Sequence, residues 1–257
     1  MVQPPNELRL TGVGVALVTL FDEDGEVDVP ATAEHAARLV DLGVRNVLVS
    51  GTTGEAAALS AEERVALLVG VREAVPDPVP VIAGTGAPSA RQAAALTRSA
   101  WEHGADAALV LSPPRVADPR RYYDVVARAA EGGPILAYHY PAASAPGIPV
   151  DVLDHLPVVG LKDSSGDPER LLQELAWGRP LYTGSSALLL MAGPAGCAGA
   201  ILALANVEPE ACAAAFAGDA AAQRNLAPAH MASRSFPTGL KELIARRFGT
   251  STVCRMG

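Results

Sequence analysis

The chain has 257 residues, a formal net charge of −8, and a composition that is 49% hydrophobic but only 4% aromatic. This length suits one large α/β domain or two small ones. The acidic balance argues against nucleic acid or an acidic membrane as a partner, because either would need a basic face. No apolar run reaches the roughly 18 residues of a membrane span, and the first six residues show no signal-peptide pattern.

The three cysteines carry little functional signal. Cys197, Cys212 and Cys254 lack paired metal-ligand spacing, and three is an odd count for disulfides. They are expected to be reduced thiols, which predicts a cytoplasmic protein.

Short apolar segments alternate with helical patterns along the chain. Helices are expected after the first four strands, at about 30–42, 60–74, 89–103 and 119–130. From residue 208 onward the sequence is Ala-rich and helical, and it ends in an amphipathic piece at 239–247. The apolar segments predict strands at 13–20, 44–49, 79–83, 107–111, 134–138, 158–162, 181–183 and 199–205.

These strands read as buried on both faces, which is typical of a parallel sheet. Eight βα units in about 250 residues predict a (β/α)₈ TIM barrel. The alternative, a doubly wound open sheet, would be expected to carry a Gly-x-Gly-x-x-Gly loop in its first βα turn, and residues 21–28 do not. The expected organisation is a barrel over 1–206, with a C-terminal helical region (207–257) packed on it rather than forming an independent domain.

Lysine usage points to one residue. Of the 20 Lys and Arg residues, only Lys162 and Lys241 are lysine. A guanidinium serves for ion pairs but cannot become a neutral amine nucleophile, whereas a buried ammonium can lose its proton. Lys162 ends an apolar approach, Val158-Val-Gly-Leu161, that reads as a buried strand. The alternative is a surface lysine that survived by chance in an Arg-rich sequence.

Barrel enzymes carry their chemistry at the C-terminal ends of the strands. An amine there can form a Schiff base with a carbonyl, Gly-rich backbone N–H groups can bind a carboxylate, and a phenol can move a proton. To be nucleophilic, the lysine must have a pKa lowered from about 10.4 to near 7–8 by burial. The side chains at these positions are Thr52, Thr53, Glu55, Arg115, Tyr138, His139, Lys162, Asp163, Ser185 and Asn206.

Simpler interpretations exist for most of these residues. The Gly51–Gly54 run can be an ordinary turn, and Tyr138 can be a core residue with a satisfied hydroxyl. His139 is expected to be a satisfied loop histidine rather than a base. Glu55 is expected to hold backbone amides, and Asp163 can equally be a turn cap.

Four sequence motifs together carry a family resemblance. They are Gly51-Thr-Thr-Gly-Glu55, Tyr138-His-Tyr-Pro141, Gly160-Leu-Lys-Asp-Ser-Ser-Gly166, and Gly199-Ala-Ile201 with Ala205-Asn206. In this order, spanning about 13–209, the chain resembles the dihydrodipicolinate synthase/N-acetylneuraminate lyase superfamily of pyruvate-dependent class I aldolases.

The resemblance implies that Lys162 forms an imine with pyruvate or another 2-oxo acid, and that Tyr138 and Thr52 take part in the proton relay. It further implies that Gly51, Thr52 and Thr53 hold the substrate carboxylate and that Ile201 lines the pocket. No metal or organic cofactor is expected. The expected partners are a small 2-oxo acid, an aldehyde, and further copies of the chain in a dimer or tetramer.

The chain also departs from the dihydrodipicolinate synthases of that superfamily. Those enzymes carry an Arg after Tyr-x-x-Pro and a tyrosine pair after the fourth strand, where this chain has Ala142-Ala-Ser-Ala-Pro146 and Pro114-Arg115. We therefore expect an aldolase acting on a 4-hydroxy-2-oxo acid or a 2-keto-3-deoxy sugar acid, with Arg115 as a candidate anion ligand. The alternatives are 4-hydroxy-tetrahydrodipicolinate synthase, and a non-catalytic barrel that binds a small acid.

Overall fold

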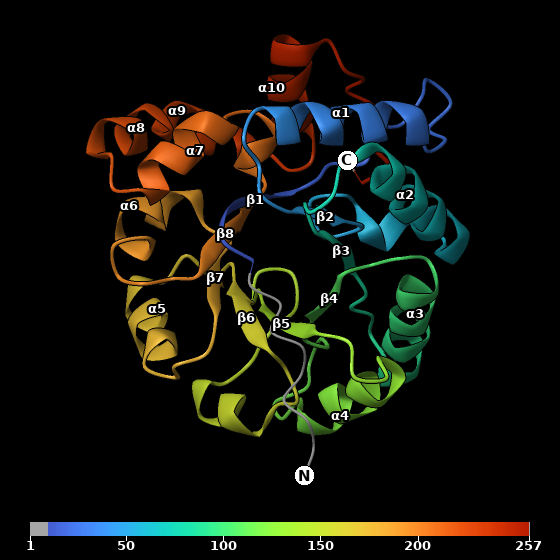
Figure 1. The fold of residues 1–257 in the computed structure, drawn as a ribbon, viewed down its shortest axis with the longest axis vertical. Helices are drawn as coiled ribbons and strands as arrows, with labels where there is room; N and C mark the ends of the chain where they lie inside the picture. The colour runs from blue at the N-terminus through green and yellow to red at the C-terminus, as the bar shows by residue number, and fades with distance from the viewer. Residues whose placement is uncertain (1–9, 257) are drawn as a thin grey trace.

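Eight parallel strands follow one another in chain order around a closed barrel (Figure 1). The structure, a computed structural model, describes residues 10–256, so the expectation for the first six residues lies outside it. The predicted (β/α)₈ barrel is confirmed. The strands are β1 (Gly12–Ala16), β2 (Val47–Val49), β3 (Val81–Gly84), β4 (Ala107–Leu111), β5 (Ile135–His139), β6 (Gly160–Asp163), β7 (Leu181–Thr183) and β8 (Gly199–Leu202).

Helices surround this barrel, and one 3₁₀ segment, Val150–His155, stands between β5 and β6. Helices α7 to α10 follow β8 and lie on the same side of the ring as α1 (Figure 1). No helix within residues 10–256 combines the length and the apolarity needed to cross a bilayer. The helices are α1 (Val29–Asp41), α2 (Ala61–Ala74), α3 (Ala90–Glu102), α4 (Arg120–Ala129), α5 (Pro168–Leu175), α6 (Leu189–Ala192), α7 (Pro209–Phe216), α8 (Ala220–Asn225), α9 (Ala227–Ser233) and α10 (Thr238–Phe248).

Successive side chains of each strand point to opposite faces, as the pleat requires. In β5, Leu136 and Tyr138 belong to the interior cluster, which also contains Ile82 and Ile201 from other strands. The alternate residues of β5 pack outward against the helices. A strand-end side chain of the inner set is therefore delivered into the ring.

Strand β1 is shorter than the pattern predicts, because it ends at Ala16 rather than near Leu20. Beyond that point the backbone bonds to side chains. The Val18 N–H donates to Asn206 Oδ1 (3.1 Å), and Asn206 Nδ2 donates to the Ala16 carbonyl (2.7 Å). Asn206, a candidate site residue from the sequence, therefore ties β1 to the 3₁₀ turn after β8.

Candidate active site

Strands β5 and β6 place a phenol and an amine next to each other. Tyr138 and Lys162 are direct partners in the parallel register of the two strands. The Lys162 side chain is buried, with 3% of its surface exposed, and its Nζ lies 4.5 Å from the centre of the Tyr138 ring. An amine suited to imine chemistry and a phenol suited to proton transfer thus share one interior site.

Burial controls the acidity of this amine. It lowers the pKa of Lys162 to about 7, because the charged form loses its hydration inside the barrel. No ion pair within residues 10–256 restores the charge of Lys162, which distinguishes it from Lys241. A neutral amine is therefore available near neutral pH.

We expect the rate of imine formation with a 2-oxo acid to rise with pH and to level off above about pH 7, where the Lys162 amine is already neutral. Rapid quenching with borohydride at a series of pH values measures this rate. A rate that keeps rising to pH 10 would mean that the amine has the acidity of an exposed lysine.

The same pKa links Lys162 to the stability of the fold. In the folded state Lys162 loses its proton at a lower pH than in the unfolded chain, so its contribution to the free energy of unfolding increases as the pH rises above about 7.

The Tyr138 hydroxyl is held in its protonated form by its surroundings. Burial raises the pKa of Tyr138 to about 12, and the neighbouring hydroxyls of Ser164 and Thr52 partly offset this rise. The three hydroxyls come from β5, the turn after β6, and the turn after β2. Such a chain of hydroxyls can pass a proton without leaving a free charge in the barrel.

Ser164 is absent from the sequence-based candidates, although it follows Lys162 by only two residues. The glycine at position 184 indicates where Ser164 lies. A Cβ at Gly184 would overlap Ser164 Oγ and stand 3.1 Å from Lys162 Cε, so a side chain there would displace both groups. The requirement for glycine after β7 could have pointed to a crowded site.

The turn after β2 presents backbone and hydroxyl groups to the same end of the barrel. The Gly54 N–H donates to the Gly51 carbonyl (3.1 Å), and Thr19 Oγ1 donates to the Gly54 carbonyl (2.7 Å). Thr52 and Thr53 are half-buried within this turn. Gly-rich turns of this kind can bind a small anion through backbone N–H groups.

Two neighbours of the central pair have structural contacts. Asp163 accepts hydrogen bonds from the Ser165 N–H (2.6 Å) and the Ser165 hydroxyl (2.9 Å), which makes it a turn cap. His139 Nδ1 accepts a hydrogen bond from the Ile148 N–H (2.8 Å). His139 is thus a satisfied histidine, as expected, and both residues stabilise the loops that frame the site.

Comparisons with known proteins extend this description. The family model for the dihydrodipicolinate synthetase family matches residues 9–248. The chain belongs to this family. It is therefore a lyase of the dihydrodipicolinate synthetase family, and the resemblance drawn from the motifs is confirmed.

Individual members of the dihydrodipicolinate synthetase family show the range of similarity. An uncharacterised DapA-like lyase of Halobacterium salinarum is 38% identical over 79% of this chain and 70% of that protein. The 4-hydroxy-tetrahydrodipicolinate synthase of Pseudomonas aeruginosa is 36% identical over 87% of this chain and 82% of that protein. The dihydrodipicolinate synthase of Acinetobacter baumannii, solved in complex with pyruvate, superposes with a TM-score of 0.88 at 29% identity, covering 96% of this chain and 92% of that one.

Two further candidates for substrate binding, Ile201 and Arg115, differ in their surroundings. Ile201 is fully buried in the interior cluster that contains Tyr138. Arg115 is exposed, in a left-handed conformation (φ 61°), and its backbone N–H donates to the Ala145 carbonyl (2.6 Å). The fold therefore places Ile201 with the central pair, whereas Arg115 contributes its backbone to the contact between two loops.

Proposed function

We propose that this protein is a class I aldolase that forms an imine between Lys162 and pyruvate or a similar 2-oxo acid. Its substrate would be a 4-hydroxy-2-oxo acid or a 2-keto-3-deoxy sugar acid. One observation carries the proposal: a buried amine whose pKa is lowered to about 7 lies 4.5 Å from the ring of a buried tyrosine at the end of adjacent strands. Schiff-base enzymes use a desolvated lysine in this way.

In this proposal the neutral Lys162 amine attacks the C2 carbonyl of the 2-oxo acid, and loss of water gives a protonated imine. The imine withdraws electrons, so a proton leaves C3 and an enamine forms. The enamine carbon attacks the aldehyde carbon, and the aldehyde oxygen takes up a proton. Hydrolysis then releases the product and returns the amine, and cleavage follows the same steps in reverse.

The hydroxyl group of Tyr138 is the proposed proton carrier for these steps. The Thr52 and Ser164 hydroxyls, which lower its pKa, support this role, because they lie on the substrate side of the site. Thr52 and Thr53, with the backbone of Gly51, are the proposed ligands of the substrate carboxylate. The pyruvate complex of the similar Acinetobacter baumannii enzyme supports pyruvate as the 2-oxo acid.

The loop after β5 favours an aldehyde without a second carboxylate. This loop, Ala142-Ala-Ser-Ala-Pro146, contains no cation. The nearest arginine in the adjoining loop is Arg115, whose backbone bonds to Ala145 while its side chain is exposed. The loop itself therefore supplies no cation for a second carboxylate, whereas hydroxyl-bearing aldehydes need none.

A second function, 4-hydroxy-tetrahydrodipicolinate synthase, is favoured by the names of relatives such as the Pseudomonas aeruginosa enzyme. Binding of a small acid without catalysis is the third. The proposal also includes assembly of the chain into a homo-oligomer, a dimer or tetramer. It places the protein in the cytoplasm with reduced cysteines, which agrees with the free cysteines of the structure.

A substrate panel tests the choice among these functions. We expect release of pyruvate from 4-hydroxy-2-oxo acids and 2-keto-3-deoxy sugar acids, measured with a coupled pyruvate assay, at rates about tenfold or more above the condensation of pyruvate with aspartate semialdehyde. Equal or faster condensation with aspartate semialdehyde would favour the second function. Thermal stabilisation by pyruvate without an imine would favour the third.

A further inference from the structure

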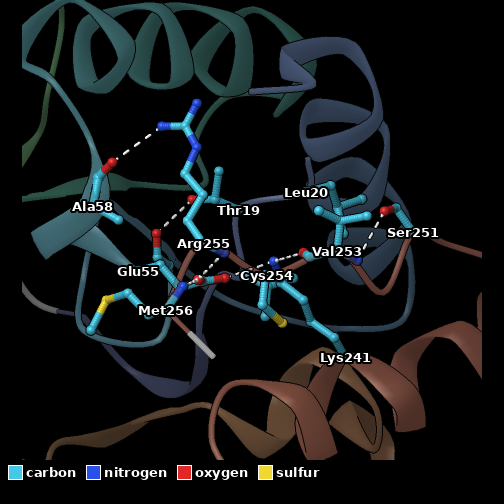
Figure 2. A network of polar contacts seen from close by, with 12 residues as sticks. Thr19, Leu20, Glu55, Ala58, Lys241, Ser251, Val253, Cys254, Arg255 and Met256 are labelled. Carbon is cyan, nitrogen blue, oxygen red and sulfur yellow. Dashed lines mark hydrogen bonds and ion pairs between the residues drawn. The ribbon is translucent and has the colours of Figure 1, made fainter. Parts of the chain in front are cut away.

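The second lysine of the chain is also buried, and it pairs with the glutamate that closes the turn after β2. Lys241 Nζ, on α10, lies 2.7 Å from Glu55 Oε1, and the two side chains are 1% and 0% exposed. Figure 2 shows the pair at the centre of a polar network. The sequence marks Lys241 only as part of an amphipathic helix, so this burial is a property of the fold.

The remaining polar atoms of the pair reach the C-terminal segment, defined here as residues 250–256. Glu55 Oε2 accepts hydrogen bonds from the backbone N–H groups of Arg255 (2.8 Å) and Met256 (2.7 Å). Lys241 Nζ donates to the Val253 carbonyl (2.6 Å). The expected role of Glu55 in holding backbone amides is thus confirmed, and the amides belong to a segment 200 positions away in the chain.

The Arg255 side chain bonds the C-terminal segment to further parts of the chain. Its guanidinium bonds to the Gly25 carbonyl (2.6 Å), the Ala58 carbonyl (3.1 Å) and the Glu63 carboxylate (2.7 Å). Figure 2 shows it extending toward Ala58 beside Glu55. The C-terminal segment therefore bridges the turn after β2 and the start of α2.

The turn held by this network is strained at both ends. Ser50 (φ 52°) and Glu55 (φ 55°) have left-handed backbone conformations although neither is glycine. Such conformations are unfavourable for residues other than glycine and persist only where the surroundings impose them. Glu55 is held by an ion pair and two amides, and Gly54 before it is held by Thr19.

We infer that Glu55 and Lys241 are positioning residues for the carboxylate site: with the C-terminal segment they hold the Gly51–Gly54 turn in its strained, binding conformation. This role rests on the proposed function of Thr52 and Thr53 as carboxylate ligands. Glu55, Lys241 and the C-terminal segment, together called the lock, act through the turn, because Glu55 follows Gly54 directly and bonds to Lys241 and to the C-terminal segment.

The test compares Lys241→Met and Glu55→Gln with the wild-type enzyme in steady-state kinetics with pyruvate. We expect the KM for pyruvate to rise about tenfold or more, with a smaller fall in kcat, because the misplaced turn weakens charge-assisted hydrogen bonds to the carboxylate. Lys241→Arg, which keeps the charge, should restore part of the affinity. Hydrogen exchange at the amides of residues 51–56 should become faster in the first two variants.

Arg247→Ala is the matched control, because Arg247 ties α10 to Glu210 (2.8 Å) on α7, away from the turn. Its KM for pyruvate should stay at the wild-type value even if the protein is less stable. If Lys241→Met does not fold because Glu55 is left unpaired, the double variant Glu55→Gln/Lys241→Met removes both charges and should still raise KM.

Suppose that borohydride traps a pyruvate adduct on the wild-type enzyme. An unchanged KM for pyruvate in the folded Glu55 and Lys241 variants would then overturn the positioning role alone. An equal rise of KM in Arg247→Ala would also overturn it, since general loosening of α10 would then explain the effect. Failure of wild-type enzyme to form any pyruvate adduct would instead overturn the proposed function, and the carboxylate role of the lock with it.

Discussion

The Lys162→Arg variant is expected to form no covalent adduct with pyruvate and to lose aldolase activity by a factor of about 10³ or more. Arginine keeps a positive charge but cannot supply a neutral amine, so the imine cannot form. Wild-type protein incubated with pyruvate and borohydride should gain the mass of pyruvate less water plus two hydrogens. Intact-mass spectrometry reads both results directly.

The amino-acid composition makes this experiment unusually clean. Lys241 is the only other lysine, and its Nζ pairs with Glu55 at 2.7 Å. Peptide mapping therefore has to distinguish two side chains only. An adduct that persists unchanged in Lys162→Arg would show that Lys162 is not the site.

A second variant guards against a folding artefact. Lys162→Met keeps much of the side-chain volume without a charge that must be desolvated. Because burial lowers the pKa of Lys162 to about 7, this variant should unfold at a higher temperature than the wild type below that pH, while it remains inactive. Loss of activity in a more stable protein would separate chemistry from stability.

The Tyr138→Phe variant is expected to lower kcat by about 10²–10⁴-fold, because it removes the hydroxyl proposed to carry protons to and from the substrate. The ring remains, and so does its contact with the Lys162 ammonium position at 4.5 Å. Borohydride trapping should still label Lys162, but more slowly. Steady-state kinetics and the time course of trapping measure the two effects.

Tyr182→Phe makes the same chemical change one strand further along. Tyr182 is the register partner of Lys162 on β7, but its hydroxyl lies by the backbone of Leu10, before β1. We expect its kcat to stay within about threefold of the wild type, since mutations away from the reacting groups have small effects. A loss in Tyr182→Phe as large as that in Tyr138→Phe would mean that the hydroxyl of Tyr138 has no special role.

The barrel and its candidate reactive lysine follow from local patterns in the sequence. Apolar segments that alternate with helical ones predict a parallel sheet buried on both faces, and eight such units in this length predict that the sheet closes into a barrel. In a chain with 18 arginines, a lysine at the end of a buried strand is conspicuous, because arginine could replace it in every role except that of an amine. These features depend on residues close together along the chain, so they can be recognised from the sequence alone.

Other parts of the site depend on contacts between distant residues. Lys241 and Arg255 lie far from Glu55 in the chain, yet they hold it in the fold. The end of β1 is set by Asn206, 190 positions away from Ala16.

The sequence by itself therefore determined the barrel and the family, and it singled out Lys162 as the candidate amine. Only the tertiary structure decided how far that amine is desolvated, which hydroxyls meet Tyr138, and what holds the strained turn at Glu55. The physical reason is that periodicity and residue type are local properties, whereas desolvation and polar pairing depend on which distant segments cover a group.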